Sequence, residues 1–406
     1  MPDRPLKGII VCDYGQHGAG SACGKVLADW GAEVIKVEPI WGDPSRSTGA
    51  MLGLRADEQE NPHFELINSG KKSIAIDLKT EEGREIMDRL IAGSNIFFSN
   101  YRLRSLKKYG LDYETLSAKY PSLIWGHING YGVAGPMAEE PGFDNVSYWA
   151  YGGLITNPAD PSERPGRSPF AGGDVMTGYV LASALAACLY QQAVSGKGEA
   201  VYTSLYGTAC WQNSCVIQRT AILGDRLTSG RPGALGPLDG FFRSKDGVWF
   251  TLGIMDYPKI GPRLAAVIGR EDLAGIFSDR AKLMINRDAN RALLEEFFLD
   301  HVWADLDRMF TGIDIVHSRV NQAGDVAGDA QARANGFVFD CAMRDGQTVP
   351  MVSTPVKFGE MGIIEASPAP LKGENTTEVL RMLSYDEDAI RGLFERKVVW
   401  ETKYDA

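Results

Sequence analysis

The first third of the chain alternates short apolar runs with helical segments, and this alternation constrains the fold more than any other feature of the sequence. Each apolar run is about as long as a buried strand and is bounded by glycine or polar residues. In chain order the segments are apolar 8–13, glycine-rich 15–20, helical 21–30, apolar 33–38 and 72–77, helical 81–91, apolar 95–98, helical 113–119 and apolar 123–128. Strand, helix and strand in this succession are typical of βαβ units. The sequence therefore predicts an α/β fold with a largely parallel sheet.

The rest of the chain changes character at a loop rich in glycine and proline. An alanine-rich apolar helix is expected at 175–194, and a shift to glycine, proline and polar residues covers 223–240. A hairpin is expected at 240–252, helical segments continue to about 331, and a second hairpin turns at 344–346. With 406 residues the chain is also longer than a typical single domain. We therefore expect two domains, with the loop at 223–240 as the clearest linker.

Charge and residue usage exclude several classes of protein. The chain has 42 basic and 52 acidic residues, and this net charge of −10 argues against nucleic-acid binding because phosphate neutralisation needs a basic face. The start lacks the apolar core of a signal peptide and no long apolar stretch is uninterrupted, so we expect a soluble cytoplasmic protein without a membrane partner. The six cysteines include no Cys-x-x-Cys pair and the five histidines have no metal-ligand spacing, so we expect reduced thiols and no metal site.

The glycine-rich turn after the first apolar run is the first candidate binding site. Glycines between a strand and a helix let backbone amides approach a phosphate, and the start of the helix favours an anion. The spacing is Gly15-x-x-Gly18-x-Gly20, which differs from the Gly-x-Gly-x-x-Gly order of dinucleotide-binding folds. Glu38 nevertheless stands where an acidic residue would hold a ribose. A structural turn and a nicotinamide site therefore both stay open, and His17 is the one histidine that we place near a site.

Asp174 is the carboxylate most suited to chemistry. It follows Gly172 and Gly173 and precedes the long apolar helix, so the plain structural interpretation is a helix N-cap. The helix dipole and the free amides at this position are expected to keep the carboxylate ionised, and the two glycines to clear space for a substrate. A carboxylate presented in this way can act as a covalent nucleophile.

A cationic cluster at 100–109 is the third candidate. It holds four cations and two aromatic residues directly after an apolar run. This is the carboxyl end of a predicted strand, where open α/β sheets bind ligands. The cluster fits either the solvated face of an amphipathic helix or a site for a phosphate and an adenine, and the sequence leaves both open.

Taken together, these segments resemble the family III CoA-transferases, the CaiB/BaiF family. The resemblance runs over nearly the whole chain, and the matching stretches are highly specific as a set. They are 30–38 (WGAEVIKVE), 68–74 (NSGKKSI), 100–101 (NY), 130–132 (GYG), 141–144 (PGFD), 173–174 (GD) and 196–199 (GKGE). The segments at 141–144 and 371–380 look most similar to the branch that acts on 2-hydroxy acids such as phenyllactate or 2-hydroxyisocaproate.

The resemblance implies a reaction in which the Asp174 carboxylate is the nucleophile. It would attack an acyl-CoA to form a mixed anhydride and then carry CoA as an aspartyl thioester, from which an acceptor carboxylate would take over the CoA. Acyl-CoA would be a substrate, with no tightly bound cofactor. The resemblance places CoA contacts at Gln16, His17, Gly18, Ala19, Lys71, Lys72, Asn100, Tyr101, Arg104 and Lys108. It places the substrate at Phe143 and Asp144, and a lid in the loop with Gly230, Gly233 and Gly236. The segment after Glu38 reads Pro39-Ile-Trp-Gly, where some relatives have an arginine for CoA.

The architecture implied by the resemblance is a Rossmann-like large domain with a parallel sheet and a smaller α+β domain. Residues 1–222 and a returning segment 332–406 would form the large domain, residues 238–331 the small one, and two chains would interlock as a homodimer. α-Methylacyl-CoA racemases are similar in sequence but pair the aspartate with a histidine in a Gly-His-Asp pattern. In this chain Phe143, directly before Asp144, occupies the position of that histidine, so one of the two acid/base groups that a racemase needs is missing. Transfer is therefore favoured, with a racemase and a non-catalytic CoA-binding homologue as the alternatives.

Overall fold

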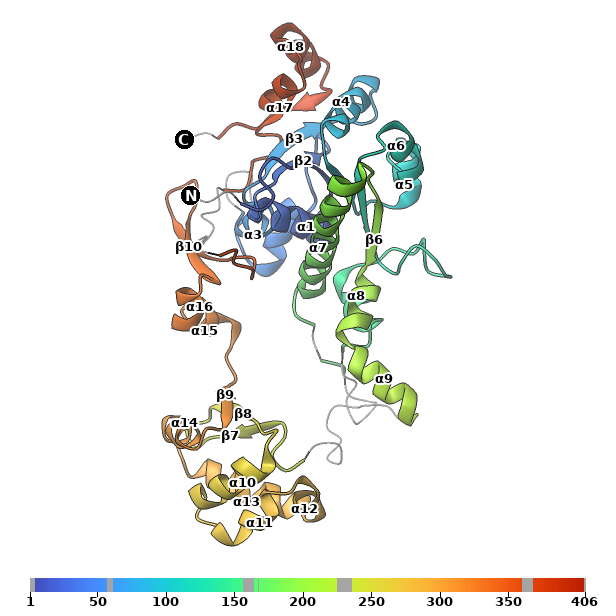
Figure 1. Ribbon diagram of the computed structural model, residues 1–406. Coiled ribbons are helices and arrows are strands. Elements are labelled where there is room, and N and C mark those ends of the chain that lie inside the picture. Colours follow the sequence, from blue (N-terminus) through green and yellow to red (C-terminus); the bar gives the residue numbers. More distant parts are fainter. Residues whose placement is uncertain are drawn as a thin grey trace. The chain divides into compact units, whose positions relative to one another are not determined.

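The computed structural model describes residues 4–56, 61–155, 164–166, 168–224, 236–359 and 368–404. The chain divides into two compact units, one formed by Met1–Leu227 with Ala330–Ala406 and the other by Thr228–Asp329. Figure 1 shows the elements of both units, coloured along the sequence. The core of the smaller unit contains residues of that unit alone.

The larger unit is built on a sheet with the strand order β12-β3-β2-β1-β4-β5-β6. Neighbouring strands are parallel, except for β12, which pairs antiparallel with β3. The strands are β1 (Ile10–Tyr14), β2 (Glu33–Glu38), β3 (Lys72–Ile76), β4 (Ile96–Ser99), β5 (Ile124–Asn129), β6 (Ala200–Ser204) and β12 (Val399–Trp400). The predicted α/β fold with a largely parallel sheet is confirmed, and the strand order reverses between β1 and β4, as in Rossmann-like folds.

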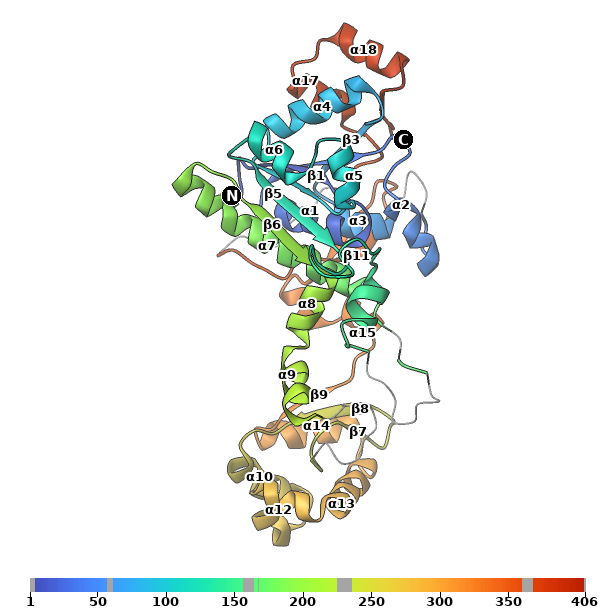
Figure 2. The same cartoon turned by 90° about the vertical axis from the view of Figure 1, so that its right-hand side faces the viewer.

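Helices cover both faces of this sheet, because successive residues of a strand point to opposite faces. In β1, Val11 shares a core with α1 (His17–Asp29) and α7 (Gly172–Ser195), whereas Cys12 shares a core with α4 (Glu81–Ala92) and α6 (Tyr113–Lys119). The helices α1 and α7 lie side by side in both views (Figures 1 and 2). The remaining elements of this unit are α2 (Ser45–Thr48), η1 (Gly49–Leu52), α3 (Pro62–Asn68), α5 (Leu103–Lys108), η2 (Asp144–Ala150), α8 (Leu205–Gln212), α9 (Ser214–Leu223), α16 (Ala330–Ala334), β10 (Val338–Ala342), β11 (Thr348–Val352), α17 (Thr376–Met382) and α18 (Glu387–Glu395).

The smaller unit packs helices against an antiparallel sheet of order β7-β8-β9. Phe250 lies at the centre of its core, with ring centroids 5.7 Å from Phe242, 5.2 Å from Phe298 and 5.7 Å from Phe310. The elements are β7 (Phe241–Arg243), β8 (Trp249–Gly253), α10 (Tyr257–Val267), η3 (Glu271–Leu273), α11 (Ala274–Phe277), α12 (Arg280–Ile285), α13 (Arg287–Leu299), α14 (Trp303–Gly312), β9 (Val316–Arg319) and α15 (Ala323–Ala327). The predicted hairpin is present as β7 and β8, but the expectation of helical segments from there to about 331 is wrong at β9.

One helix among the described residues, α7, is long and apolar enough to cross a membrane by length and composition. Core helices of proteins outside membranes meet the same criteria, so this is a weak indication. Part of α7 packs closely against α1: a Cβ on Gly178 would stand 2.6 Å from the Ala19 carbonyl oxygen and 2.8 Å from the Ala22 Cβ. The glycine thus allows the two helices to touch at the start of α1.

Candidate active site

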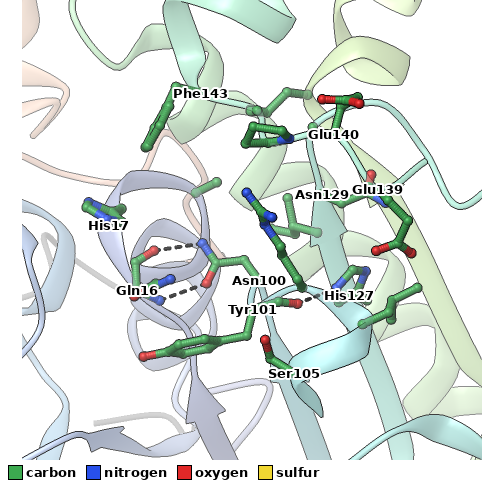
Figure 3. A pocket seen from close by; sticks show the side chains of 18 of the residues that line it. Gln16, His17, Asn100, Tyr101, Ser105, His127, Asn129, Glu139, Glu140 and Phe143 are labelled. Carbon is green, nitrogen blue, oxygen red and sulfur yellow. Dashed lines mark hydrogen bonds between the residues drawn. The ribbon is translucent and has the colours of Figure 1, made fainter. Parts of the chain in front are cut away.

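A cavity of about 480 Å³ opens at the carboxyl ends of β1, β4 and β5. The strand order reverses between β1 and β4, and such reversals are where open α/β sheets bind ligands. The turn after β1, the residue after β4 and the last residue of β5 contribute Gln16, His17, Asn100 and Asn129 (Figure 3). Further lining residues are Ala19, Tyr101, Arg102, Arg104, Ser105, Glu139, Glu140, Pro141, Gly142, Phe143 and Asp174.

Asn100 fixes the turn after β1. Its Oδ1 accepts a hydrogen bond from the Gln16 amide at 2.8 Å, and its Nδ2 donates to the Gln16 carbonyl oxygen at 2.7 Å (Figure 3). The contact joins the two strands between which the sheet order reverses. Since the side-chain amide of Asn100 both accepts from and donates to the Gln16 backbone, this residue positions the turn in this structure.

Asp174 is not the N-cap of α7, so that interpretation is wrong. The N-cap position is Ala171, whose φ of 54° lies in the left-handed region. The Asp174 amide donates to Oδ1 of Asp144 at 2.9 Å. A carboxylate from another segment therefore binds the start of the helix, and the side chain of Asp174 is left to line the cavity.

The expectation that the helix start keeps Asp174 ionised is also wrong. Burial and the neighbouring Asp144 carboxylate raise the pKa of Asp174 from its ordinary value of 3.8 to about 7. Burial also raises the pKa of Asp144, although backbone amides at the start of α7 act in the opposite direction. Desolvation and like charge both penalise the ionised form, and here they outweigh the helix dipole.

Gly18 brings the start of α1 into contact with Asp174. A Cβ at Gly18 would stand 2.2 Å from Oδ2 and 2.8 Å from Cγ of Asp174. Gly173 has a different function from the one predicted, because a Cβ there would stand 2.2 Å from the Tyr148 ring and 2.7 Å from Oδ1 of Asp144. That glycine makes room for the protein's own side chains rather than for a substrate.

The two predicted lysines lie outside the cavity. Lys71 is buried, and its Nζ donates to Asp13 Oδ2 (2.9 Å), Asn68 Oδ1 (2.9 Å) and the Ser21 carbonyl oxygen (2.8 Å). All three donors are used, which leaves none for CoA. Lys72 forms ion pairs with two glutamates at 2.6 Å and 2.8 Å. Neither lysine therefore reaches the cavity in this structure.

The cations of the cluster at 100–109 divide into two groups. Arg104 lines the cavity together with Tyr101 and Arg102, whereas Lys108 lies exposed at the end of α5 and does not line it. The cluster is therefore partly a solvated helix face and partly a cavity wall.

Glu38 is not available to hold a ribose. It is 1% exposed, and its two oxygens accept hydrogen bonds from Arg46 Nε (2.8 Å) and Nη2 (2.6 Å), the Asp43 amide (2.9 Å) and the Ser73 hydroxyl (2.7 Å). Each carboxylate oxygen thus has two donors. The nicotinamide interpretation, which rested on this residue, has no support in the structure.

Sequence reasoning missed the loop between Gly130 and Gly142. A Cβ at Gly142 would stand 2.5 Å from the Gly130 Cα, so the two ends of the loop touch. Glu139 and Glu140 belong to this loop and line the cavity (Figure 3). Both glycines belong to stretches that resemble the family, but the sequence does not show that they contact each other.

The predicted lid falls largely on residues that the structure does not describe. Gly230 and Gly233 lie outside the described residues, and Gly236 belongs to the smaller unit, where its amide donates to Oδ2 of Asp239 at 2.7 Å. Within the described part of the chain, no group of three His, Cys, Asp or Glu side chains could hold a metal ion.

Comparison with known proteins identifies the family of the chain. The profile of CoA-transferase family III matches residues 6–376. The (R)-2-hydroxy-4-methylpentanoate CoA-transferase of Clostridioides difficile is 36% identical over 97% of this chain and 99% of its own length. The cinnamoyl-CoA:phenyllactate CoA-transferase of Clostridium sporogenes is 32% identical over 98% of both chains. A CaiB/BaiF family protein from Brucella suis superposes with a TM-score of 0.78 at 30% identity, covering 94% of this chain and 100% of that one. The chain belongs to CoA-transferase family III and is a CoA-transferase.

Proposed function

We propose that this chain transfers CoA from an acyl-CoA to a carboxylic acid, with Asp174 as the covalent nucleophile. One observation carries this proposal: the Asp174 carboxylate lines the cavity at the strand-order reversal, in contact with Gly18 at the start of α1. Its pKa of about 7 leaves a large ionised fraction at neutral pH, and partial desolvation makes that carboxylate more reactive.

The reaction balances without water or ATP. The Asp174 carboxylate attacks the thioester carbonyl and expels the CoA thiolate, which leaves a mixed anhydride. The thiolate then attacks the Asp174 carbonyl carbon and releases the donor as a carboxylate, which leaves an aspartyl-CoA thioester. The acceptor carboxylate attacks this thioester and expels the CoA thiolate, which leaves a second anhydride, and the thiolate then attacks the acceptor carbonyl of that anhydride. The new acyl-CoA departs and the Asp174 carboxylate is regenerated.

Mass spectrometry of the protein after incubation with an acyl-CoA tests this mechanism. A CoA adduct, or a modification of Asp174 after hydroxylamine or borohydride treatment, is the expected result. Absence of any adduct, together with deuterium exchange at the α-carbon without an acceptor acid, would indicate a racemase and overturn the proposal. Binding of CoA without either reaction would indicate a non-catalytic homologue.

The acceptor that we propose is a 2-hydroxy acid. The two relatives named above are called transferases of (R)-2-hydroxy-4-methylpentanoate and of phenyllactate, and both align over nearly the whole chain. A screen of carboxylic acids against one acyl-CoA donor tests this assignment, which fails if 2-hydroxy acids are not among the preferred acceptors.

We place the adenosine end of CoA in a second cavity of about 310 Å³. This cavity shares Tyr101 and Ser105 with the first, so one extended ligand can occupy both. Trp41 lines it with 65% of its surface exposed, and Lys79 Nζ lies 5.3 Å from the Trp41 ring centroid. An exposed indole beside a cation suits a base that carries phosphates.

Replacement of Trp41 by alanine is expected to raise KM for the acyl-CoA about tenfold, because stacking on an aromatic ring contributes about 1–3 kcal/mol per base. The KM for the acceptor acid should not change. Trp400 provides a matched control, since it is 49% exposed, has Lys372 Nζ 5.0 Å from its ring and lines neither cavity. An unchanged KM for acyl-CoA in the Trp41 variant would contradict the placement.

Asp144→Asn is expected to move the acid limb of the pH profile of kcat/KM to lower pH. The new amide side chain retains an oxygen that accepts from the Asp174 amide. Burial still raises the pKa of Asp174, but the negative charge that adds to this shift is lost, so the carboxylate is ionised at lower pH. Asp112→Asn is a suitable control, because Asp112 caps α6 through the Thr115 amide and lies outside both cavities. A limb that stays in place or moves to higher pH would contradict this electrostatic coupling.

A homodimer and a cytoplasmic location stay predictions. The homodimer is supported by the apolar surface of the larger unit: α9 has no buried residue, and Trp211, Ile222 and Tyr190 are 80%, 75% and 77% exposed. A surface of this kind is expected to be covered by a partner, and sedimentation equilibrium distinguishes a dimer from a monomer.

A further inference from the structure

The backbone of the turn Gly15–His17 is held by side chains from four segments of the larger unit. Every polar backbone atom from the Gly15 amide to the His17 amide has a side-chain partner. The contacts are Gly15 N to Asp13 Oδ1 (2.8 Å), Lys36 Nζ to Gly15 O (2.9 Å), Gln16 N to Asn100 Oδ1 (2.8 Å), Asn100 Nδ2 to Gln16 O (2.7 Å) and His17 N to Asp43 Oδ1 (3.1 Å). The turn is therefore fixed atom by atom.

Three of these contacts, those of Asp13, Lys36 and Asp43, come from members of fully buried ion pairs. Lys36 pairs with Asp43 at 2.7 Å and Asp13 with Lys71 at 2.9 Å, and none of the four side chains is more than 1% exposed. A buried ion pair adds little net stability, because desolvation offsets most of the Coulombic attraction. Stability alone thus gives no reason for this arrangement. Contact with the turn explains the arrangement, because both ion pairs bind the backbone of the turn directly.

The turn also holds a strained residue next to the nucleophile. His17 has φ 55°, in the left-handed region that non-glycine residues seldom adopt. Such a conformation costs about 1–3 kcal/mol and persists only where the surroundings enforce it. Asp43 enforces it here by accepting from the His17 amide. The next residue, Gly18, is the one in contact with Asp174.

We propose that Lys36 and Asp43 are positioning residues for CoA binding, which hold the Gly15 carbonyl and the His17 amide so that the turn lines the cavity beside Asp174. This inference rests on the proposed function, because it assumes that CoA binds against Gln16, His17 and Ala19. Neither Lys36 nor Asp43 lines the cavity, so both act through the turn.

The electrostatics of the pair keep this support in place over the range in which Asp174 titrates. Burial alone would raise the pKa of Asp43, but the Lys36 ammonium and the amides of Ser45 and His17 lower it to about 2. Burial alone would lower the pKa of Lys36, but the carboxylates of Asp43, Asp13 and Glu38 raise it above its ordinary value. Both partners therefore stay charged while Asp174 changes its protonation near pH 7.

The test is the dissociation constant of CoA, measured by titration calorimetry for Asp43→Asn. The substitution keeps the size of the side chain, but it places an NH₂ donor against either the Lys36 ammonium or the amide donors of His17 and Ser45. The dissociation constant is expected to rise about tenfold or more, since a displaced turn loses well-formed contacts to the ligand. Calorimetry is chosen because a partly unfolded sample lowers the binding stoichiometry and leaves the dissociation constant unchanged.

Asp29→Asn is the matched control. Asp29 forms a buried ion pair with Lys25 within α1, and its other oxygen accepts from Thr354 at 3.0 Å, so it has no contact with the turn. A dissociation constant within about twofold of wild type is expected. If Asp43→Asn leaves CoA binding unchanged, or if Asp29→Asn weakens it equally, the inference is wrong.

A second variant keeps the test decisive if Asp43→Asn does not fold. Lys36→Met combined with Asp43→Asn removes both charges at once, so that no unpaired charge stays buried and the fold is retained. The Gly15 carbonyl still loses its donor, and the same weakening of CoA binding is expected. Wild-type protein that does not bind CoA would overturn the proposed function together with this inference. Wild-type binding with no effect in this variant would overturn the inference alone.

Discussion

Asp174→Ala is expected to lower kcat for CoA transfer by at least about 1000-fold, because the mechanism has no other group to carry the anhydride and the thioester. No adduct should be trapped after incubation with acyl-CoA. The dissociation constant of CoA should stay within about tenfold of wild type, since the turn and the second cavity make the other contacts. Rapid-mixing kinetics measure kcat, and mass spectrometry detects the adduct. Retained turnover would remove Asp174 from its role.

The same variant should gain stability, and the gain should depend on pH. The pKa of Asp174 is about 7 in the folded protein, against an ordinary value of 3.8, so the folded state binds the proton more tightly. Ionisation therefore costs folding free energy as pH rises from about 4 to above 7, and no cost applies where both states are protonated. Melting temperatures of Asp174→Ala and wild type should converge near pH 4 and differ most near pH 8. A loss of stability at pH 8 would contradict the buried, like-charged environment of this carboxylate.

The elements of the large sheet were predictable because their signals are local. The apolar run at 33–38 and the helical pattern at 113–119 match β2 and α6 residue for residue. The strand β12 had no such signal, since it has two residues and pairs with β3, more than 300 residues earlier in the chain. The strand β9 was not predicted for a similar reason, because it pairs with β8, from which the helices of the smaller unit separate it in sequence.

The site shows the same division between local and distant causes. Asp174 was identified from the residues around it, but the direction of its pKa shift depends on its burial in the fold and on Asp144, which is 30 residues away in sequence. The sequence also could not show that Lys71 is buried against Asp13, because neighbouring lysines at 71 and 72 look alike until the ion pairs are known. Buried charged residues that hold the turn by hydrogen bonds are therefore the part of this site that the sequence predicts least well.

Gly18→Ala is expected to lower kcat/KM about 100-fold, since a displacement of about 1 Å near reacting groups has effects of this size. The new Cβ would stand 2.2 Å from Oδ2 of Asp174 and 2.8 Å from its Cβ and Cγ. The backbone cannot give way easily, because Gly178 already holds α7 within contact of the Ala19 carbonyl oxygen. The carboxylate must therefore turn away. Gly93→Ala is the matched control, because Gly93 has φ −89° and its Cβ would meet neighbours only at 3.8 Å.

A double-mutant cycle shows whether the carboxylate is the group that collides. Overpacking at Gly18 is expected to cost about 1–3 kcal/mol in unfolding free energy, of which better helix propensity returns up to about 1 kcal/mol. In the Asp174→Ala background most of the clashing atoms are gone, so the cost of Gly18→Ala should shrink by more than the error of additivity, about 0.5 kcal/mol. Equal costs in both backgrounds would mean that the alanine is accommodated elsewhere. The loss of activity would then need a cause other than displacement of Asp174, whereas a positive coupling energy ties the glycine of the turn to the nucleophile itself.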